Sequence, residues 1–319
     1  MRSALFLVAL TLALPLRAWD VYVTNEQSGT VTVIDGLTNE VKATVTVGTR
    51  PRGVQASRDG SRVYVALSDS DQQAEGDGDA IVGIDTRTYR VVSRHAAGSD
   101  PEQFAISSDG HYLYSANEDA GTASITDVES RKILTTLIVG IEPEGVGISP
   151  NDRWVYVTAE TSNTVSVIDT KKREVVASFM VDARPRAVAF SPTRRRAYVT
   201  AEIGGTVSVV DADAHEVIDT IDLGDAKPVG VTVSPNGKRV YVANGHAASV
   251  SILDAESNEL LATVRVGKRP WGIAVSPDGR YLYTANGISN DVTVIDAVTR
   301  RAVRTIPVGE RPWGVAITP

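Results

Sequence analysis

Three markers recur along the chain at a spacing close to 42 residues, and this repeat restricts the fold more than any other feature. A tyrosine opens the second apolar run of each unit, at Tyr22, Tyr64, Tyr114, Tyr156, Tyr198, Tyr241 and Tyr283. An aspartate closes the third run, at Asp35, Asp85, Asp127, Asp169, Asp211, Asp254 and Asp296. A proline precedes the first run, at Pro51, Pro101, Pro143, Pro185, Pro228, Pro270 and Pro312. The markers agree on seven copies, and such a period with four strands per copy is typical of propeller blades.

The last complete unit shows why each copy is predicted to form antiparallel strands. Residues 272–276 and 281–285 are β-branched or aromatic runs of strand length. The Ser-Pro-Asp-Gly of residues 276–279 between them predicts a turn, because proline presets φ and glycine tolerates a positive φ. Residues 291–296 alternate polar and apolar side chains, as a strand with one solvated face does.

The two ends of the chain predict how the ring closes. The chain enters its first unit at the second strand, residues 20–25, and ends after a first strand, residues 313–318. We therefore predict an all-β fold: a seven-bladed β-propeller of four-stranded antiparallel blades, closed by pairing of the C-terminal strand with the N-terminal strands. The alternative, an open solenoid, leaves both end strands unpaired.

Residues 1–18 have the composition of a secretory signal peptide. Arg2 gives a positive start, residues 4–14 are an uncharged apolar run, and residues 16–18 end in a small-residue cleavage site. The apolar run is shorter than the roughly 20 residues that span a bilayer. We expect residues 1–18 to be removed on export to the periplasm, leaving one propeller domain, 19–319, as a monomer without a membrane span. An uncleaved anchor is the alternative.

Charge and cysteine content exclude several functions. The net charge of −7 becomes −9 when Arg2 and Arg17 are removed, which argues against nucleic acid as a partner. The absence of cysteine excludes disulfides, thiolate metal sites and covalently attached c-type haem. The four histidines fall on different elements, so we expect each to be a surface or turn residue. They are His95, His111, His215 and His246.

The Tyr-Val-Thr-Asn of residues 22–25, with Val-Thr-Val-Ile-Asp after it, resembles the YVTN β-propeller repeat, and the match covers residues 20–319. Motifs that differ between blades are similar to the β-propeller proteins associated with catabolism that depends on pyrroloquinoline quinone (PQQ). These motifs occupy residues 100–105, 142–145, 181–186, 201–209 and 286–292. An insertion at 68–80 and the short fifth unit at 225–230 depart from that family.

The resemblance implies an exported seven-bladed propeller that accompanies periplasmic alcohol oxidation and transport. The partners it implies are a PQQ-dependent dehydrogenase, a c-type cytochrome or a transporter component. The tryptophan-docking repeats of the dehydrogenases themselves are missing from this sequence.

The residues that flank each proline are expected to start the innermost strand of a blade, at one mouth of the central channel. Acids cluster there on two blades, and cations with two indoles fill an adjoining sector. Guanidinium groups suit carboxylates and indoles offer flat apolar contact, so an anionic ring such as PQQ fits this sector. The predicted ligand-binding residues are Arg50, Arg52, Glu102, Glu144, Arg184, Arg186, Lys227, Arg269, Trp271, Arg311 and Trp313.

Two interpretations of this mouth stay open at the level of sequence. The mouth binds a ligand or partner, or its arginine–glutamate pairs satisfy one another while the tryptophans pack on the next blade. A further acid follows the tyrosine by four residues in four units. We expect these acids to form a solvated face, with a ring of carboxylates that repels anions at the mouth as the alternative. They are Glu26, Glu118, Glu160 and Glu202. The residues one position earlier, Asn25, Asn117, Asn244 and Asn286, are expected to bond the loop backbone.

Residues 68–80 form the longest predicted loop and carry five acids in thirteen residues. The EF-hand spacing fails because Ala74 stands where the sharp-turn glycine belongs. We expect an acidic loop over the mouth, with calcium binding as the alternative, and we predict no resident metal or cofactor.

Two classes of function follow from these patterns. The favoured class is a non-enzymatic periplasmic binding or scaffold propeller that serves PQQ-linked alcohol oxidation or its transport system. The alternative is a lactonase or lyase with Glu102 and Glu144 as general bases and Arg184 or Arg186 as electrophile. A raised pKa on one glutamate would favour the enzyme, whereas paired, ionised glutamates would favour the scaffold.

Overall fold

The computed structural model describes residues 19–68 and 78–319. The predicted signal peptide, residues 1–18, lies outside the described residues, as does most of the segment for which calcium was considered, residues 69–77. Within the described residues, no helix is long and apolar enough to cross a membrane.

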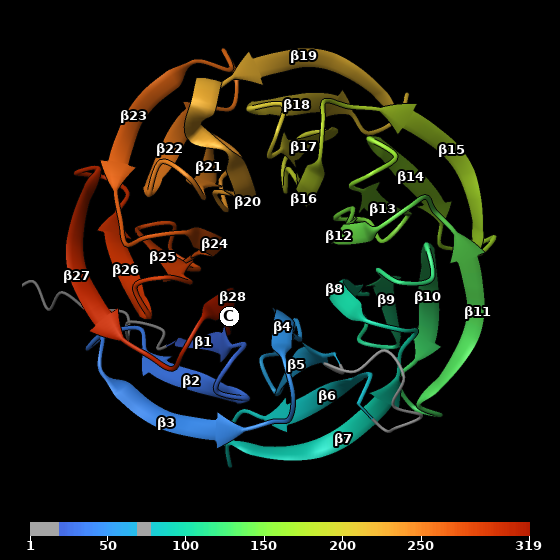
Figure 1. The fold of residues 1–319 in the computed structure, drawn as a ribbon, viewed down its shortest axis with the longest axis horizontal. Coiled ribbons are helices and arrows are strands. Elements are labelled where there is room, and N and C mark those ends of the chain that lie inside the picture. The colour runs from blue at the N-terminus through green and yellow to red at the C-terminus, as the bar shows by residue number, and fades with distance from the viewer. Residues whose placement is uncertain (1–18, 69–77) are drawn as a thin grey trace, which may run out of the picture.

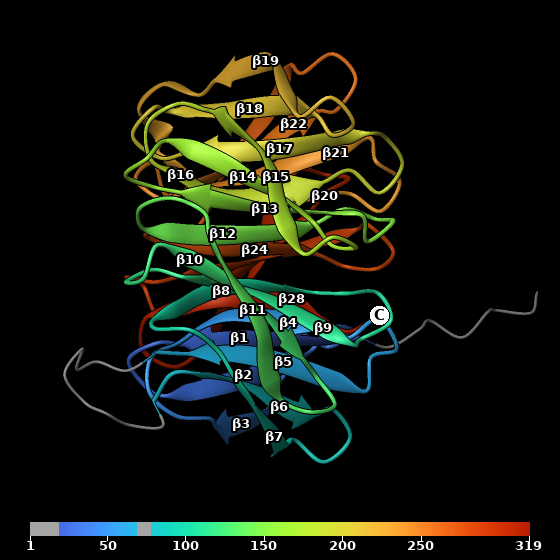
Figure 2. The same cartoon turned by 90° about the vertical axis from the view of Figure 1, so that its right-hand side faces the viewer.

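Seven four-stranded antiparallel sheets stand around a central axis, and each sheet is one blade (Figure 1). Seen edge-on, the blades form a thick disc (Figure 2). We number the blades from the sheet that contains β1: blade 1 is β28-β1-β2-β3, blade 2 is β4 to β7, and so on to blade 7, β24 to β27.

The innermost strands are β4 (Pro51–Ala56), β8 (Pro101–Ile106), β12 (Pro143–Ile148), β16 (Pro185–Phe190), β20 (Pro228–Val233), β24 (Pro270–Val275) and β28 (Pro312–Ile317). The second strands are β1 (Asp20–Asn25), β5 (Arg62–Leu67), β9 (Tyr112–Asn117), β13 (Trp154–Ala159), β17 (Arg196–Ala201), β21 (Arg239–Asn244) and β25 (Tyr281–Asn286).

The third strands are β2 (Thr30–Asp35), β6 (Ala80–Asp85), β10 (Thr122–Asp127), β14 (Thr164–Asp169), β18 (Thr206–Asp211), β22 (Ser249–Asp254) and β26 (Asp291–Asp296). The outer strands are β3 (Val41–Thr46), β7 (Arg90–Ala96), β11 (Lys132–Ile138), β15 (Glu174–Met180), β19 (Glu216–Asp222), β23 (Leu260–Arg265) and β27 (Arg301–Pro307). A short 3-10 helix, Gly224–Ala226, precedes β20. The expectation of a short fifth unit is wrong, because the spacing from Pro185 to Pro228 is 43 residues, one more than between the neighbouring prolines.

The predicted ring closure is confirmed in blade 1. Strand β28 pairs antiparallel with β1, with Val315 opposite Val23 and Ile317 opposite Val21. The backbone N–H of Thr318 also donates to the carbonyl of Asp20 at 3.0 Å. The sheet thus joins the two ends of the chain, so blade 1 has no edge left open by a missing strand.

The core lies between neighbouring blades. Neighbouring blades cover both faces of the second and third strands. Nearly every side chain of these strands is therefore buried, although polar and apolar residues alternate in the sequence. Tyr22, Tyr156, Tyr198 and Tyr283, four of the seven repeat tyrosines, have no exposed surface. Most side chains of the outer strands are exposed to solvent, and those of β19 and β27 include charged residues.

The innermost strands approach one another closely because a glycine follows two residues after most of the prolines. A Cβ on Gly145 would lie 2.2 Å from the carbonyl oxygen of Arg186 on the next blade, and one on Gly314 would lie 2.5 Å from that of Arg52. A threonine hydroxyl ties such contacts together: Thr24 Oγ1 donates to the Arg52 carbonyl at 2.7 Å and accepts from the Gly314 N–H at 2.8 Å. Close packing of the inner strands therefore fixes the width of the channel.

Two other sequence expectations are wrong, the second of them in part. His95 is a core residue, 2% exposed, with Nε2 2.9 Å from Ser93 Oγ and its ring edge-on to Tyr64. Its place in β7 next to the blade 3 interface, rather than at the rim, explains the burial. The four asparagines at the ends of the second strands donate mainly to side chains of the third strand; Asn25, for example, reaches Thr30 and Thr32. The expected bond to the loop backbone is present at Asn117, whose Oδ1 accepts the Gly98 N–H at 3.1 Å.

Candidate functional site

A cavity of about 360 Å³ opens at one mouth of the central channel. It is lined by Glu26, Arg52, Glu102, Glu118, Glu144, Glu160, Arg184, Arg186, Arg269, Trp271, Gly287, Ile288, Arg311 and Trp313. Nine of the eleven predicted binding residues are in this lining, whereas Arg50 and Lys227 are not. The proline-flanking positions therefore do converge on one volume.

The backbone at the start of each innermost strand explains this convergence. All seven residues before the blade prolines have a positive φ, between 40° and 63°, which is uncommon for residues other than glycine. In six blades the carbonyl of that residue accepts an N–H from the loop between the second and third strands; the Glu160 N–H to Glu142 bond, for example, measures 2.9 Å. The two loops of a blade are thus held together and place their side chains at the same mouth.

Arg186 is the centre of a buried ion-pair cluster between blades 4 and 5. Its guanidinium contacts Glu144 and Glu160, and its Nε lies 3.3 Å from Glu202. Arg184 adds a 2.6 Å contact to Glu160, and Arg269 reaches Glu202 at 2.8 Å from blade 7. Three arginines face three glutamates, so this cluster is balanced in charge. Buried ions require such pairing, because desolvation without a partner costs several kcal/mol.

A second cluster surrounds Arg52 on blade 2 and has fewer cations than acids. Arg52 Nε lies 3.0 Å from Glu26, and its Nη1 contacts Glu102 and lies 3.8 Å from Glu118. Arg50 lies 3.5 Å from Asp100. Two arginines thus face four carboxylates on blades 1 and 3.

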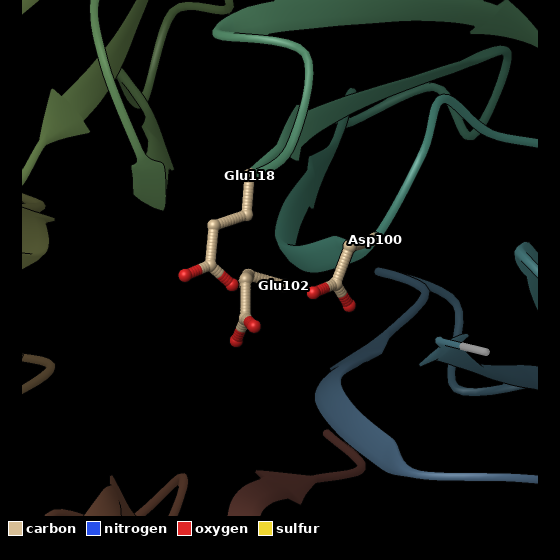
Figure 3. A group of neighbouring side chains, drawn as sticks. All are labelled: Asp100, Glu102 and Glu118. Atoms are coloured by element: carbon tan, nitrogen blue, oxygen red, sulfur yellow. The ribbon is translucent and has the colours of Figure 1, made fainter. Parts of the chain in front are cut away.

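Three of these carboxylates gather closely at the inner end of blade 3 (Figure 3). One oxygen from each of Asp100, Glu102 and Glu118 lies within 4.8 Å of the others, a spacing that a hard cation such as calcium can bridge. The Arg52 guanidinium already contacts Glu102, the most buried of the three. Glu102 and Glu118 of this group line the cavity and make this side of it acidic.

Burial and neighbouring acids change the protonation of two of these glutamates. Burial raises the pKa of Glu118 to about 7, with Asp100 and Glu144 adding to the rise and Arg52 opposing it. Burial also raises the pKa of Glu144, against the opposing charge of Arg186. Glu118 is thus the carboxyl group of the cavity that changes its charge near neutral pH.

The opposite wall of the cavity, on blades 7 and 1, is aromatic. The rings of Trp271 and Trp313 lie roughly parallel, with centroids 6.1 Å apart and an interplanar angle of 19°. The Arg269 guanidinium lies over the Trp271 ring at 4.2 Å, a favourable cation–π geometry. Ile288, 65% exposed, stands at the rim of the same wall.

The expectation of a solvated acidic face is wrong for the acids four residues after the tyrosines. Glu160 and Glu202 are 7% and 5% exposed, and they bond to arginines of the mouth. Glu26, Glu118 and Glu160 line the cavity together with the proline-flanking residues, as the alternative of carboxylates around the mouth predicts. Their repeat position was visible in the sequence, but their pairing depends on distances across blades. Most arginines of the mouth are paired with glutamates, and a cavity remains beside these pairs.

Fold and cavity together define a class of protein: a seven-bladed β-propeller with a charged, aromatic-walled cavity at one mouth of its channel. The chain belongs to the YNCE-like beta-propeller family, whose profile matches residues 10–274. A search of curated proteins finds no match.

Solved structures share the fold over most of the chain. Hydrazine synthase of Kuenenia stuttgartiensis is 23% identical, covers 86% of this chain and 92% of its own, and has a TM-score of 0.76. A Bacteroides fragilis protein described as a "putative 6-phosphogluconolactonase" is 19% identical, with coverage of 95% and 98% and a TM-score of 0.79. A protein of unknown function from Desulfotomaculum acetoxidans is 18% identical, with coverage of 93% and 98% and a TM-score of 0.78. At these identities the likeness concerns the fold alone.

Proposed function

We propose that this chain is a non-catalytic binding propeller that holds a small anionic organic ligand in the mouth cavity. The observation that carries the proposal is the make-up of that cavity, where arginines and indoles share one volume. Its size of about 360 Å³ falls within the range of roughly 300–1,000 Å³ that ligand pockets occupy.

The setting we propose follows the resemblance of the blade motifs. The protein is exported to the periplasm and acts there as a monomer accessory to PQQ-dependent alcohol oxidation or its transport system. A PQQ-dependent dehydrogenase, a c-type cytochrome or a transporter component is its partner, and PQQ is a candidate ligand. The motifs at residues 100–105 and 181–186 support this setting, and both lie at the mouth.

The proposal is tested by titrating PQQ into the protein and following tryptophan fluorescence. We expect quenching in the wild type and weaker binding in Trp271→Ala and Arg269→Ala, since both side chains line the cavity. Arg195→Ala is the control, because Arg195 is 83% exposed and pairs with Asp213 away from the mouth. Unchanged affinity in both cavity variants would reject this site. Native mass spectrometry of protein taken from its own periplasm then identifies any other anion that is bound.

A hydrolytic enzyme is the second candidate, and the pKa of Glu118, raised to about 7, is the observation that favours it. Glu102 and Glu144 suit the role of general base less well, because both are buried against arginines. Hydrolysis of 6-phosphogluconolactone is the reaction to test, because two similar structures are described as putative lactonases for it. An enzyme predicts a rate that rises through pH 7 and is lost in Glu118→Gln; a rate equal to that of buffer eliminates this candidate.

A further inference from the structure

We infer that the mouth cavity selects a flat organic monoanion, with its acid group on Arg311 and its ring against Trp271, Trp313 and Ile288. This inference rests on the proposed function, because it assigns a ligand class and an orientation to the same cavity.

The first step is the distribution of apolar side chains. The cavity lining contains three of them, Trp271, Ile288 and Trp313, and all three belong to blades 7 and 1. A Cβ on Gly287 would lie 2.8 Å from Cδ1 of Trp271, so only a glycine lets this indole rest against the loop. The ring of a bound ligand therefore has one wall on which to lie.

The second step is the availability of cations. Arg52, Arg184, Arg186 and Arg269 each contact at least one glutamate. Within residues 19–68 and 78–319, Arg311 makes no salt bridge, although it lines the same cavity and is exposed. A ligand carboxylate meets a guanidinium there without having to displace a protein carboxylate, and such charge-assisted bonds are the stronger ones.

The third step is the fixed position of Arg311. Its backbone N–H donates to Asn290 Oδ1 at 2.9 Å, and its carbonyl accepts the N–H of Glu26 at 2.9 Å. Trp313 follows two residues later at the start of the same strand, so the backbone positions that carry the cation and the indole have a defined spacing. Such preorganisation lowers the entropy lost on binding.

The fourth step concerns the far wall. Glu102 and Glu118 line the cavity on the side of blade 3, and Asp100 lies beside them, so carboxylates outnumber arginines there. A second anionic group on the ligand would approach these acids and be repelled. The cavity thus favours one negative charge at the Arg311 end and a neutral ring beyond it, and PQQ, with three carboxyl groups, is accordingly expected to bind more weakly than a flat monoanion.

Isothermal titration with probes that share one ring system tests this inference. The probes are 2-naphthoate, with one negative charge, 2,6-naphthalenedicarboxylate, with two, and 2-naphthylmethylammonium, with one positive charge. For the wild type we expect 2-naphthoate to bind most tightly and the dicarboxylate roughly fivefold more weakly. Arg311→Gln should weaken 2-naphthoate about tenfold, the usual effect of losing one charged hydrogen bond.

Arg195→Gln is the matched control, because it removes the same charge from an exposed arginine that pairs with Asp213 away from the mouth. We expect its affinity for 2-naphthoate to stay within about twofold of the wild type. At pH 8.5, where Glu118 with its pKa of about 7 is ionised, Glu118→Gln should bring the dicarboxylate closer to the monoanion, because it removes a negative charge from the far wall. Unchanged melting temperatures establish that the variants are folded.

The outcomes separate the two proposals. Equal binding of both carboxylates, or full affinity in Arg311→Gln, overturns the monoanion inference and leaves the anion-binding cavity standing. Preference for the ammonium probe overturns both proposals. Failure of the carboxylates and of PQQ to bind the wild type overturns the proposed function itself.

Discussion

At the scale of single residues, the mouth depends on buried charges that stabilise one another. Arg186 is 6% exposed and touches glutamates from its own blade and from blade 4. Its guanidinium also lies 5.0 Å from the Trp271 ring. Glu160 and Glu202 have further arginine partners, but removal of Arg186 would leave the buried Glu144 without its ion pair.

We therefore predict that Arg186→Met lowers the free energy of unfolding by about 3–5 kcal/mol, the cost of breaking a buried ion pair on one side. Arg184→Met serves as the control, because Arg184 is 44% exposed and should contribute no more than about 1 kcal/mol. Urea denaturation followed by fluorescence measures both. Small and equal losses would mean that the carboxylates do not depend on Arg186.

His95 supplies a pH-dependent prediction of known sign. Burial lowers the pKa of His95 below its usual 6.5, so the unfolded chain binds a proton more readily than the folded one. Stability should therefore fall as the pH drops below 6.5, and His95→Gln should lose this part of the pH dependence. The difference between wild type and variant isolates the effect, since the raised pKa of Glu118 acts with the opposite sign in both proteins. Parallel stability curves from pH 7 to 5 would contradict the prediction.

At the scale of elements, each blade repeats one turn between its third and outer strands. The aspartate that closes the third strand accepts two backbone N–H bonds from the turn in every blade but blade 3, where Asp127 accepts one from Ser130. At Asp211 these bonds come from Asp213 and Ala214, both at 2.9 Å. These bonds hold the pKa of Asp211 below its ordinary value. The same contacts recur at Asp35 and Asp254, which explains why this aspartate follows the period of the sequence.

We predict that Asp211→Ala destabilises the fold by about 1–2 kcal/mol, because two donors lose their acceptor. Asp211→Asn keeps an acceptor oxygen and should cost less. Because the folded pKa of Asp211 is lowered, its contribution is present above the unfolded value of 3.8 and is lost as the pH falls through the folded pKa. Thermal melts at pH 7 and pH 3 should show a larger difference between wild type and Asp211→Ala at the higher pH.

At the scale of the whole molecule, the ring depends on a single strand that returns to its start. Strand β28 pairs with β1 and also packs between β24 and β4, so it takes part in blade 1 and in both of its interfaces (Figure 1). Its removal would expose the inner edge of β1 and the face of blade 7.

Truncation at residue 311 is accordingly predicted to abolish cooperative unfolding and to cause aggregation, because an open edge strand pairs with other chains. Removal of Pro319 alone is the control and should leave the melting temperature within a few degrees of the wild type. Calorimetry and light scattering distinguish the outcomes. A soluble truncated chain with an unchanged melting transition would show that the ring does not need this closure.

The fold could be predicted from the sequence because each of its markers lies within a short stretch of the chain. Strand runs, turn residues and the period of 42 specify seven meanders, and the incomplete units at the two ends specify which strands must pair. For the same reason the proline-flanking residues could be assigned to one mouth, and nine of them do line its cavity.

Which of these side chains form ion pairs, and which stay unpaired, depends on the tertiary structure. Arg269 on blade 7 reaches Glu202 on blade 5 across an intervening blade, and Glu118 owes its raised pKa to burial beside Asp100 and Glu144. Such contacts join residues far apart in the chain, at distances set by the channel width and the close approach of the inner strands. The repeat fixes the position of each residue within its blade, but Coulomb interactions and desolvation depend on the space between blades.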